Sequence, residues 1–536
     1  MPTHHRLYWG TRKDAQVVIL EYGSKSTPLI AGVCRGLGVC TDTMRPADLM
    51  GRIADGRIPK AIFVSGGPDS VYDPAALPIP YELLIHLNQH FGTRIFNICY
   101  GAQAFVHRAG GVVVKADRPE VGVVHLSVRG VHGRYQGGSV VMNHTDAITA
   151  LPDGWENWGV TEQSPFAYFG KEEEGIVCTL FHPELGDTKD GEKLMAHFLY
   201  SLARCRMDHA AGPESFVADA IPFICESAPE GGMVVGVSGG VDSAVTLELC
   251  RRALGRERVY GIHVDNGFLR EGEAEEVRRL LGEDGMIYED AALLFWRTCE
   301  RIPWRNVPEK AYFAKLRLAM GQRFIEVFEK RARRIGGIRY LGQGTNFSDI
   351  QETVTGLVDH HNVGGLPEEM GLEVVEPLAG LHKFEIREVA EYLGLHPEIV
   401  WRQPSPGPAN SIRMWPPVTR AKAGPVGRAN RILEEEVRRY YHDPHDRPSQ
   451  YYAALMSGRM AGLIGDEGVY GYVILVRAVK RNPRESYASA EAFPFPDDLW
   501  HTLDMRIRAE VAMPDGPIVA VCWHGTGKPS ARIELF

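Results

Sequence analysis

The chain has 536 residues, of which 44% are hydrophobic and 24% are charged, and its formal net charge is −9. This length exceeds what one hydrophobic core usually organises, so roughly two to four domains are expected. The negative charge argues against a nucleic-acid-binding protein, which normally carries a basic surface. Apolar runs fall short of the ~18 residues that span a bilayer, and the N-terminus lacks the apolar core of a secretory signal. A cytoplasmic protein is therefore expected.

The pattern of apolar residues changes along the chain and predicts three domains after a short N-terminal extension at 1–14. Residues 15–207 alternate short β-rich runs with amphipathic stretches, which is typical of an α/β domain with a parallel sheet. The same alternation returns in 208–410. In 411–536, long helical stretches precede two strand-like runs. The predicted fold is α/β, with two doubly wound parallel-sheet domains and a small α+β domain at the C-terminus.

A cysteine stands where an apolar strand meets a turn of small residues and a probable helix start, in RIFNICYGAQAF. Such an elbow exposes a nucleophile, here Cys99, and the backbone N–H after it can help to hold an oxyanion. A cysteine reacts as the thiolate and needs a basic partner, for which His182 in TLFHPELGDT is the best candidate. Glu184 lies two residues further and can orient the imidazole. The segment SGGPDS offers glycine backbone donors at Gly66 and Gly67.

Five motifs in this part of the chain, SGGP, ICYGAQ, RPEVG, NHTD and FHPE, follow in the order found in class I (triad-type) glutamine amidotransferases. The first domain therefore resembles that family. The resemblance implies that Cys99 forms a glutamyl thioester, that His182 transfers protons, and that Glu184 orients the imidazole. It also implies oxyanion and glutamine contacts from Gly67, Tyr100 and Gln103.

One residue near the nucleophile departs from the family pattern, because Asn97 stands where a glycine is usual. Asparagine tolerates unusual backbone angles better than most residues, so the glutaminase is expected to be active but slow or conditional. The alternative interpretation makes Cys99 a core cysteine, which is the common fate of a free cysteine. The five motifs together favour the catalytic interpretation.

The second domain begins with VVGVSGGVDSAV, an apolar strand followed by glycines and a helix start. Backbone N–H groups in such a loop, together with the helix dipole, favour a bound phosphate. No GxxxxGK[ST] sequence occurs, so a Walker A loop is excluded. The segment resembles the PP-loop of N-type ATP pyrophosphatases, in which Asp242 would also bind magnesium. The resemblance implies an ATP site formed by Ser238, Gly239, Gly240, Val241, Asp242, Ser243, Val264 and Lys383.

Four later segments resemble the glutamine-hydrolysing GMP synthetase family, and the resemblance then covers nearly the whole chain. They are HVDNGFLREGE (263–273), GQGTNFSDI (342–350), DHHNVGGLP (359–367) and EPLAGLHKFEIRE (376–388). In that family 359–367 belongs to a mobile lid, and the third domain forms a homodimer and completes the acceptor pocket. The acceptor would be xanthosine 5′-monophosphate (XMP), bound by Arg317, Asp466, Lys528 and Glu534. The expected partners are small molecules only, with neither nucleic acid nor membrane.

The departures from the family concentrate in the acceptor region. Gly468 and Val469 stand where an arginine and a threonine are usual, SPGPAN replaces a more glycine-rich segment at 405–410, and the chain ends in Leu535-Phe536. An arginine supplies a rigid bidentate donor that glycine cannot replace. These departures keep open a paralogue that aminates a different heterocyclic carbonyl. Asn97 keeps open a second alternative, a catalytically silent regulatory or scaffold protein.

Overall fold

The computed structural model describes residues 4–7, 9–10, 14–24, 26–129, 135–210, 212–347, 349, 371–464, 466–480 and 490–527. The chain divides into two compact units. The first consists of Trp9–Ser215, and the second mainly of Phe216–Arg481 and Ala488–Phe536, with the N-terminal residues before Trp9. Within the described ranges, every helix is too short or too polar to cross a membrane. The expected lid at 359–367 lies outside the described residues.

The first unit is built on a nine-stranded sheet in the order β3-β2-β4-β5-β10-β9-β8-β6-β7. In this order the first five strands, β3, β2, β4, β5 and β10, are parallel, as the sequence predicts. The remaining pairs are antiparallel. Strands buried on both faces read as continuous apolar runs, and VVIL of β2 and AIFV of β4 do so. The strands are β2 (Val17–Leu20), β3 (Thr41–Met44), β4 (Ala61–Val64), β5 (Arg94–Ile98), β6 (Val112–Val128), β7 (Gly138–Ala150), β8 (Glu156–Val160), β9 (Tyr168–Lys171) and β10 (Ile176–Thr179).

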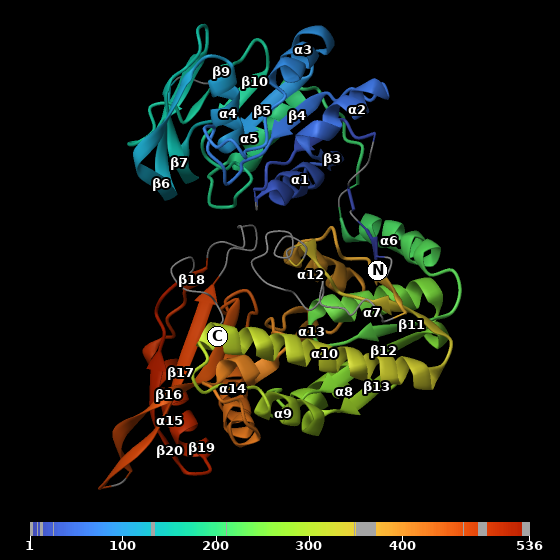
Figure 1. Cartoon of the computed structure of the whole chain (residues 1–536), viewed down its shortest axis with the longest axis vertical. Helices are drawn as coiled ribbons and strands as arrows, with labels where there is room; N and C mark the ends of the chain where they lie inside the picture. Colours follow the sequence, from blue (N-terminus) through green and yellow to red (C-terminus); the bar gives the residue numbers. More distant parts are fainter. Residues whose placement is uncertain are drawn as a thin grey trace. The chain divides into compact units, whose positions relative to one another are not determined.

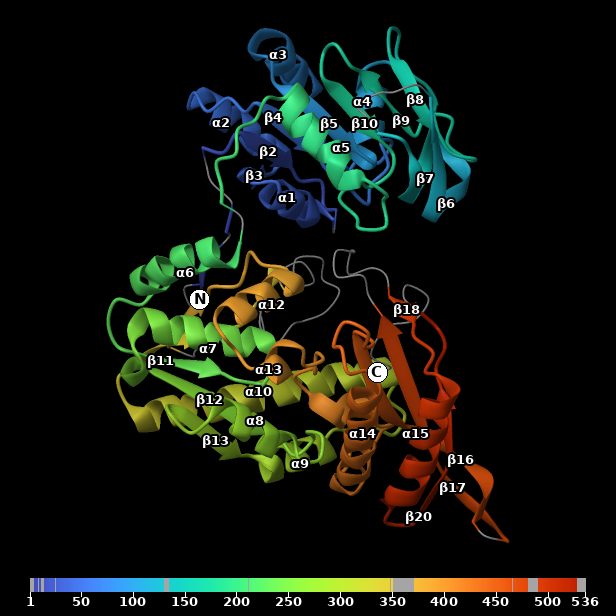
Figure 2. The same cartoon turned by 180° about the vertical axis from the view of Figure 1, so that it is seen from behind.

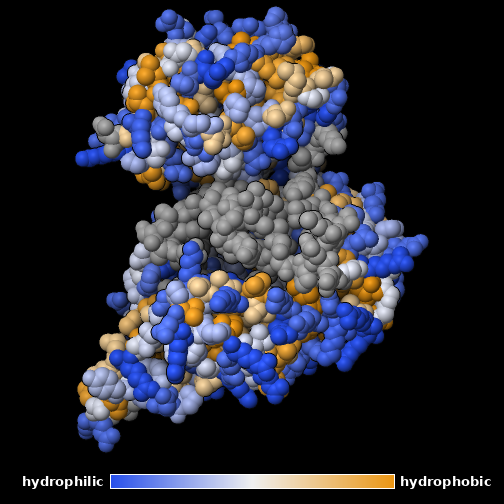
Figure 3. Space-filling view, in the orientation of Figure 1, coloured by the Kyte–Doolittle hydropathy of each residue, from blue (hydrophilic) through white to orange (hydrophobic). Residues whose placement is uncertain are grey.

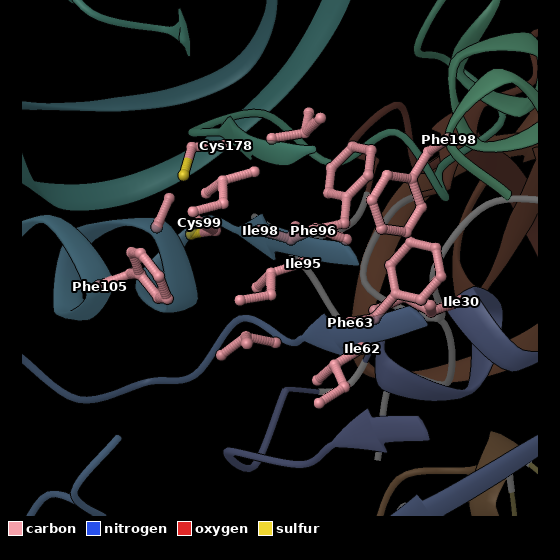
Figure 4. Close-up of a cluster of buried hydrophobic side chains, with 14 of the residues drawn as sticks. Ile30, Ile62, Phe63, Ile95, Phe96, Ile98, Cys99, Phe105, Cys178 and Phe198 are labelled. Carbon is pink, nitrogen blue, oxygen red and sulfur yellow. The ribbon is translucent and has the colours of Figure 1, made fainter. Parts of the chain in front are cut away.

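Helices flank the parallel part of this sheet (Figures 1 and 2). They are α1 (Thr27–Gly36), α2 (Leu49–Ala54), α3 (Tyr81–Phe91), α4 (Tyr100–Arg108) and α5 (Gly191–His197). The core between sheet and helices contains stacked and edge-on aromatic rings, with Phe63, Phe96 and Phe198 separated pairwise by 5.1–5.4 Å (Figure 4). Cys99 follows Ile98 at the edge of this core, where β5 leads into α4 (Figure 4).

The second unit begins with a six-stranded sheet in which every pair is parallel, in the order β1-β15-β14-β11-β12-β13. Its edge strand β1 (His4–Arg6) comes from the predicted N-terminal extension and pairs with β15. Helices α7 and α10 cover opposite faces of this sheet (Figure 1). The remaining strands are β11 (Gly232–Gly236), β12 (Val259–Asp265), β13 (Met286–Asp290), β14 (Ile338–Gly342) and β15 (Glu373–Glu376). The helices are α6 (Pro213–Ser227), α7 (Val241–Leu254), α8 (Glu273–Leu281), α9 (Ala292–Glu300), α10 (Glu309–Ile335), α12 (Lys383–Tyr392) and α13 (Pro397–Val400).

A second sheet completes this unit, with the order β16-β17-β20-β19 and β18 paired to β17. One hydrophobic core runs from Val234 of β11 to Val476 of β17, which explains why both sheets belong to one unit. The predicted domain boundary near residue 410 therefore stays a prediction. The elements are α14 (Arg420–Tyr440), β16 (Gln450–Ile464), β17 (Glu467–Lys480), β18 (Glu491–Ala492), α15 (Asp497–Glu510), β19 (Ala512–Met513) and β20 (Gly516–Trp523). On the visible face of each unit, apolar side chains are dispersed among hydrophilic ones (Figure 3).

Candidate functional site

The nucleophile elbow forms between β5 and α4, and Cys99 is the residue that makes the turn. Its backbone angles are φ 52° and ψ −112°, a conformation that a non-glycine residue adopts at a cost of about 1–3 kcal/mol. Gly101 permits the sharp turn, because a Cβ atom there would lie 2.5 Å from the carbonyl oxygen of Val64. Cys99 directly precedes the first residue of α4 and so lies at the N-terminal end of that helix.

His182 and Glu184 form a buried pair beside the cysteine. His182 Nδ1 lies 2.7 Å from Glu184 Oε1 and 3.4 Å from Ser26 Oγ, and Cys99 also interacts with the imidazole. Burial alone would lower the pKa of His182, but the Glu184 carboxylate and Cys99 outweigh it and raise the pKa well above its ordinary value. The structure therefore brings the three predicted catalytic residues together, and Glu184 and Cys99 both favour the protonated form of the imidazole.

The glycine loop after β4 closes over the same place. A Cβ atom on Gly66 would lie 3.3 Å from Cε1 of His182 and 3.5 Å from the Cβ atom of Cys99. A Cβ atom on Gly67 would lie 2.6 Å from the carbonyl oxygen of Tyr22 and 3.3 Å from Cδ1 of Tyr100. Only glycine allows the backbone of this loop to approach so closely. The predicted oxyanion residues Gly67 and Tyr100 are thus neighbours.

Behind the nucleophile, a hydrogen-bonded segment of β7 forms another wall. The Cys99 sulfur lies 3.6 Å from the carbonyl oxygen of Asn143, which sequence reasoning missed. Gln103, whose predicted contact with glutamine stays a prediction, donates from Nε2 to the carbonyl oxygen of Asp146 at 2.8 Å. Asp146 accepts a further hydrogen bond from Ser70 Oγ at 2.6 Å. These bonds fix the β7 segment beside the cysteine.

A buried glutamate connects two of the sequence motifs. Glu120, in RPEVG, accepts hydrogen bonds of 2.6 Å from Thr161 Oγ1 and Ser164 Oγ. Its Oε2 atom lies 3.4 Å from Nε2 of His144, in NHTD. Burial alone would raise the pKa of Glu120, but these hydrogen bonds and His144 lower it below its ordinary value. Both motifs can be recognised in the sequence, but the contact between Glu120 and His144 depends on the pairing of strands β6 and β7.

Asn97 lies inside β5, two residues before the nucleophile, and its side chain is fully buried. Its Nδ2 atom lies 3.3 Å from the Cys178 sulfur on the neighbouring strand β10. The positive φ angle of the elbow falls at Cys99 and not at Asn97. The substitution therefore changes a strand position, not the turn itself.

The predicted ATP loop connects β11 to α7. Gly239 has φ +84°, a left-handed conformation that favours glycine. Within the loop, Ser243 Oγ donates to the carbonyl oxygen of Gly240 at 3.0 Å, and the Gly240 N–H lies 3.3 Å from Ser238 Oγ. Val241 is the first residue of α7, so the loop delivers backbone N–H groups and a helix N-terminus to the same place.

Acidic and basic side chains meet at the start of α7. Asp242 forms an ion pair with Lys383, the first residue of α12, and both residues belong to the predicted ATP site. Its other carboxylate oxygen, Oδ1, is buried without a hydrogen-bond partner among the described residues. Arg387, one turn beyond Lys383, also acts electrostatically on Asp242, although burial lowers the pKa of this guanidinium. Val264 is buried at the carboxyl end of β12, adjacent to β11.

Of the four residues predicted to bind the acceptor, the structure describes two. Arg317 is half-buried in α10, and Asp466 is exposed in the turn between β16 and β17. Figures 1 and 2 show that this hairpin extends away from the rest of its unit. Lys528 and Glu534 lie outside the described residues. The acceptor pocket therefore remains a prediction.

Taken together, the Cys99–His182–Glu184 arrangement and the PP-loop on a parallel sheet define a class I glutamine amidotransferase joined to an ATP pyrophosphatase. Three family models match the chain. "Glutamine amidotransferase class-I" matches residues 18–202, "NAD synthase" matches 217–293, and "GMP synthase C terminal domain" matches 437–535.

Full-length relatives agree with this division of the chain. The glutamine-hydrolysing GMP synthase of Thermomicrobium roseum is 36% identical over 97% of this chain and 96% of its own. The enzyme of Lactococcus lactis is 32% identical over 97% of this chain and 98% of its own length. The enzyme of Bartonella bacilliformis is 33% identical over 98% of this chain and 99% of its own length. The chain belongs to the family of glutamine-hydrolysing GMP synthases.

Proposed function

We propose that the protein is a ligase of GMP biosynthesis that converts XMP into GMP with glutamine as the nitrogen donor and ATP as the driving reagent. The observation that carries the proposal is the presence in one chain of the Cys99–His182–Glu184 arrangement and a PP-loop, with relatives of this name matching nearly the full length. Glutamine and water give glutamate and ammonia, and XMP, ATP and ammonia give GMP, AMP and pyrophosphate.

In the amidotransferase half, the Cys99 thiolate attacks the amide carbon of glutamine. The imidazolium of His182, held by Glu184 at 2.7 Å, donates the proton that lets ammonia leave. Water activated by the neutral imidazole then hydrolyses the glutamyl thioester. Backbone N–H groups of Gly67 and Tyr100 stabilise the oxyanion in both steps.

In the synthetase half, the N–H groups of the loop from Ser238 to Ser243 bind the pyrophosphate part of ATP. Lys383 contacts a phosphate once its ion pair with Asp242 opens. The buried Oδ1 atom of Asp242, which has no hydrogen-bond partner among the described residues, would suit a hard divalent cation such as Mg²⁺. When bound, the cation neutralises charge on the departing pyrophosphate.

Adenylylation solves the chemical problem of the acceptor. A carbonyl oxygen conjugated into a purine is a poor leaving group, whereas AMP is a good one. The oxygen on carbon 2 of XMP attacks the α-phosphorus and pyrophosphate leaves, and ammonia then displaces AMP from carbon 2. Arg317, Asp466, Lys528 and Glu534 are the residues proposed to bind XMP. The homodimer and the cytoplasmic location belong to the same proposal and rest on the family resemblance.

The two alternatives have less support. No relative named above points to an acceptor other than XMP, and Gly468 lies exposed in the β16–β17 hairpin. The strained angles of Cys99 and the buried His182–Glu184 pair carry a cost that a silent scaffold has no physical reason to keep.

The test is to incubate the purified protein with magnesium, ATP, glutamine and XMP and to follow all products by mass spectrometry. Formation of GMP with equal amounts of AMP and pyrophosphate supports the proposal. The absence of GMP, in a protein that binds ATP and releases glutamate from glutamine, would refute XMP as the acceptor.

A further inference from the structure

A buried arginine outside the predicted ATP site touches the PP-loop. Arg402 is 4% exposed and follows α13. Its Nη1 atom donates to the carbonyl oxygen of Gly239 at 3.3 Å, and its Nη2 atom donates to Glu273 Oε1 at 2.8 Å. A Cβ atom on Gly239 would lie 2.8 Å from the same Nη1 atom. The guanidinium therefore packs directly against the left-handed residue of the loop.

Glu273 connects this contact to the C-terminal part of the unit. Its second oxygen lies 3.3 Å from Nε of Arg270, whose Nη1 atom lies 3.0 Å from Glu434 on α14. Burial alone would raise the pKa of Glu273, but the charges of Arg270 and Arg402 outweigh it and lower the pKa to about 2. The carboxylate thus stays charged and holds Arg402 in place.

The position of this contact matters because of peptide geometry. In a trans peptide unit the carbonyl and the following N–H point in opposite directions. By holding the Gly239 carbonyl, Arg402 fixes the direction of the Gly240 N–H. This N–H donates to Ser238 Oγ, and a bound phosphate would replace that oxygen as the acceptor. A planar guanidinium can donate to two acceptors in fixed directions, which a lysine ammonium does less rigidly.

We propose that Arg402 is a positioning residue of the ATP site, which fixes the phosphate-binding loop through the Gly239 carbonyl, and that Glu273, Arg270 and Glu434 anchor it to helix α14. This inference rests on the proposed function of the loop. Arg402 does not contact substrate in this scheme. It acts only through the orientation of the loop.

The experiment measures GMP synthesis driven by ammonium, so that the amidotransferase half is not needed, with ATP varied at saturating XMP. For Arg402→Lys we expect kcat/KM for ATP to fall about 10- to 100-fold, as a displaced binding loop does elsewhere, while KM for XMP is unchanged. Glu273→Gln keeps Arg402 but removes the charge that holds its guanidinium, so we expect a smaller fall in kcat/KM for ATP. This variant replaces Arg402→Lys in the test if Arg402→Lys does not fold.

The matched control is Arg438→Lys. Arg438 belongs to the same ionic cluster, through Glu434 at 2.7 Å and Glu276 at 2.9 Å, but does not donate to the loop. It is expected to keep the wild-type kinetics for ATP. A lower melting temperature of Arg402→Lys with wild-type kinetics for ATP would show a merely structural role and overturn the inference. If the wild type makes no GMP, the proposed function fails. The inference is then tested by calorimetry, where Arg402→Lys must bind ATP with magnesium more weakly than Arg438→Lys does.

Discussion

The substitution Gly67→Ala isolates the contribution of the glycine loop to glutamine hydrolysis. The new Cβ atom would lie 2.6 Å from the carbonyl oxygen of Tyr22, whereas ordinary contacts begin at 3.4 Å. The loop must therefore move by about 0.8 Å, the difference between these two distances. A shift of this size removes the Gly67 N–H from hydrogen-bonding range of the oxyanion. Loss of one such donor lowers kcat by about 10²–10³-fold in comparable sites.

The assay follows glutamate release in the presence of ATP and XMP, and in parallel GMP synthesis from ammonium. Glutamine-dependent activity is expected to fall, and ammonium-dependent activity to stay at the wild-type level. Gly51→Ala is the control. Gly51 lies in α2, and outside its own helix no described residue has an atom within 4 Å of the added Cβ, and alanine suits a helix. Wild-type glutamine turnover by a correctly folded Gly67→Ala protein would refute the oxyanion role.

Three further substitutions separate the two halves of the enzyme. Cys99→Ala is expected to abolish glutamine use while high ammonium restores GMP synthesis, measured as product per enzyme; failure of ammonium to rescue contradicts the role in ammonia supply. Glu184→Gln removes the charge that raises the pKa of His182, so the imidazolium titrates at lower pH and glutamine-dependent kcat falls by up to ~10⁴-fold. An NMR titration of His182 that shows no downward shift would contradict this account. Asp242→Asn is expected to abolish synthesis from both glutamine and ammonium, because the magnesium that accompanies the pyrophosphate loses a carboxylate ligand. Retained synthesis from ammonium would exclude that role.

The parts of the site that the sequence predicts well are local. The elbow at Cys99 follows from an apolar strand, small residues and a helix start within a few positions, and the spacing of His182 and Glu184 places both on one turn. The loop from Ser238 to Ser243 is likewise one continuous segment. Short-range sterics and hydrogen bonding determine such features, so the sequence pattern is sufficient.

Motif resemblance grouped Cys99 with His182, and Asp242 with Lys383, but other contacts between distant segments could not be predicted from the sequence. Arg402 meets Gly239 across 163 positions, and Glu120 meets His144 only because β6 pairs with β7. The pairing of β1 with β15 is of the same kind, since three residues carry no periodic signal of their own. Burial and register, which tertiary packing sets, decide these contacts.

The central claim is that ammonia from glutamine replaces an oxygen that ATP has activated. One reaction tests both parts, with glutamine carrying nitrogen-15 in its amide and XMP carrying oxygen-18 on carbon 2. The account predicts GMP that contains nitrogen-15 and AMP that contains oxygen-18 in its phosphate, because AMP leaves with the acceptor oxygen. Oxygen-18 in pyrophosphate or in water, with none in AMP, would contradict the adenylylated intermediate and with it the proposed mechanism.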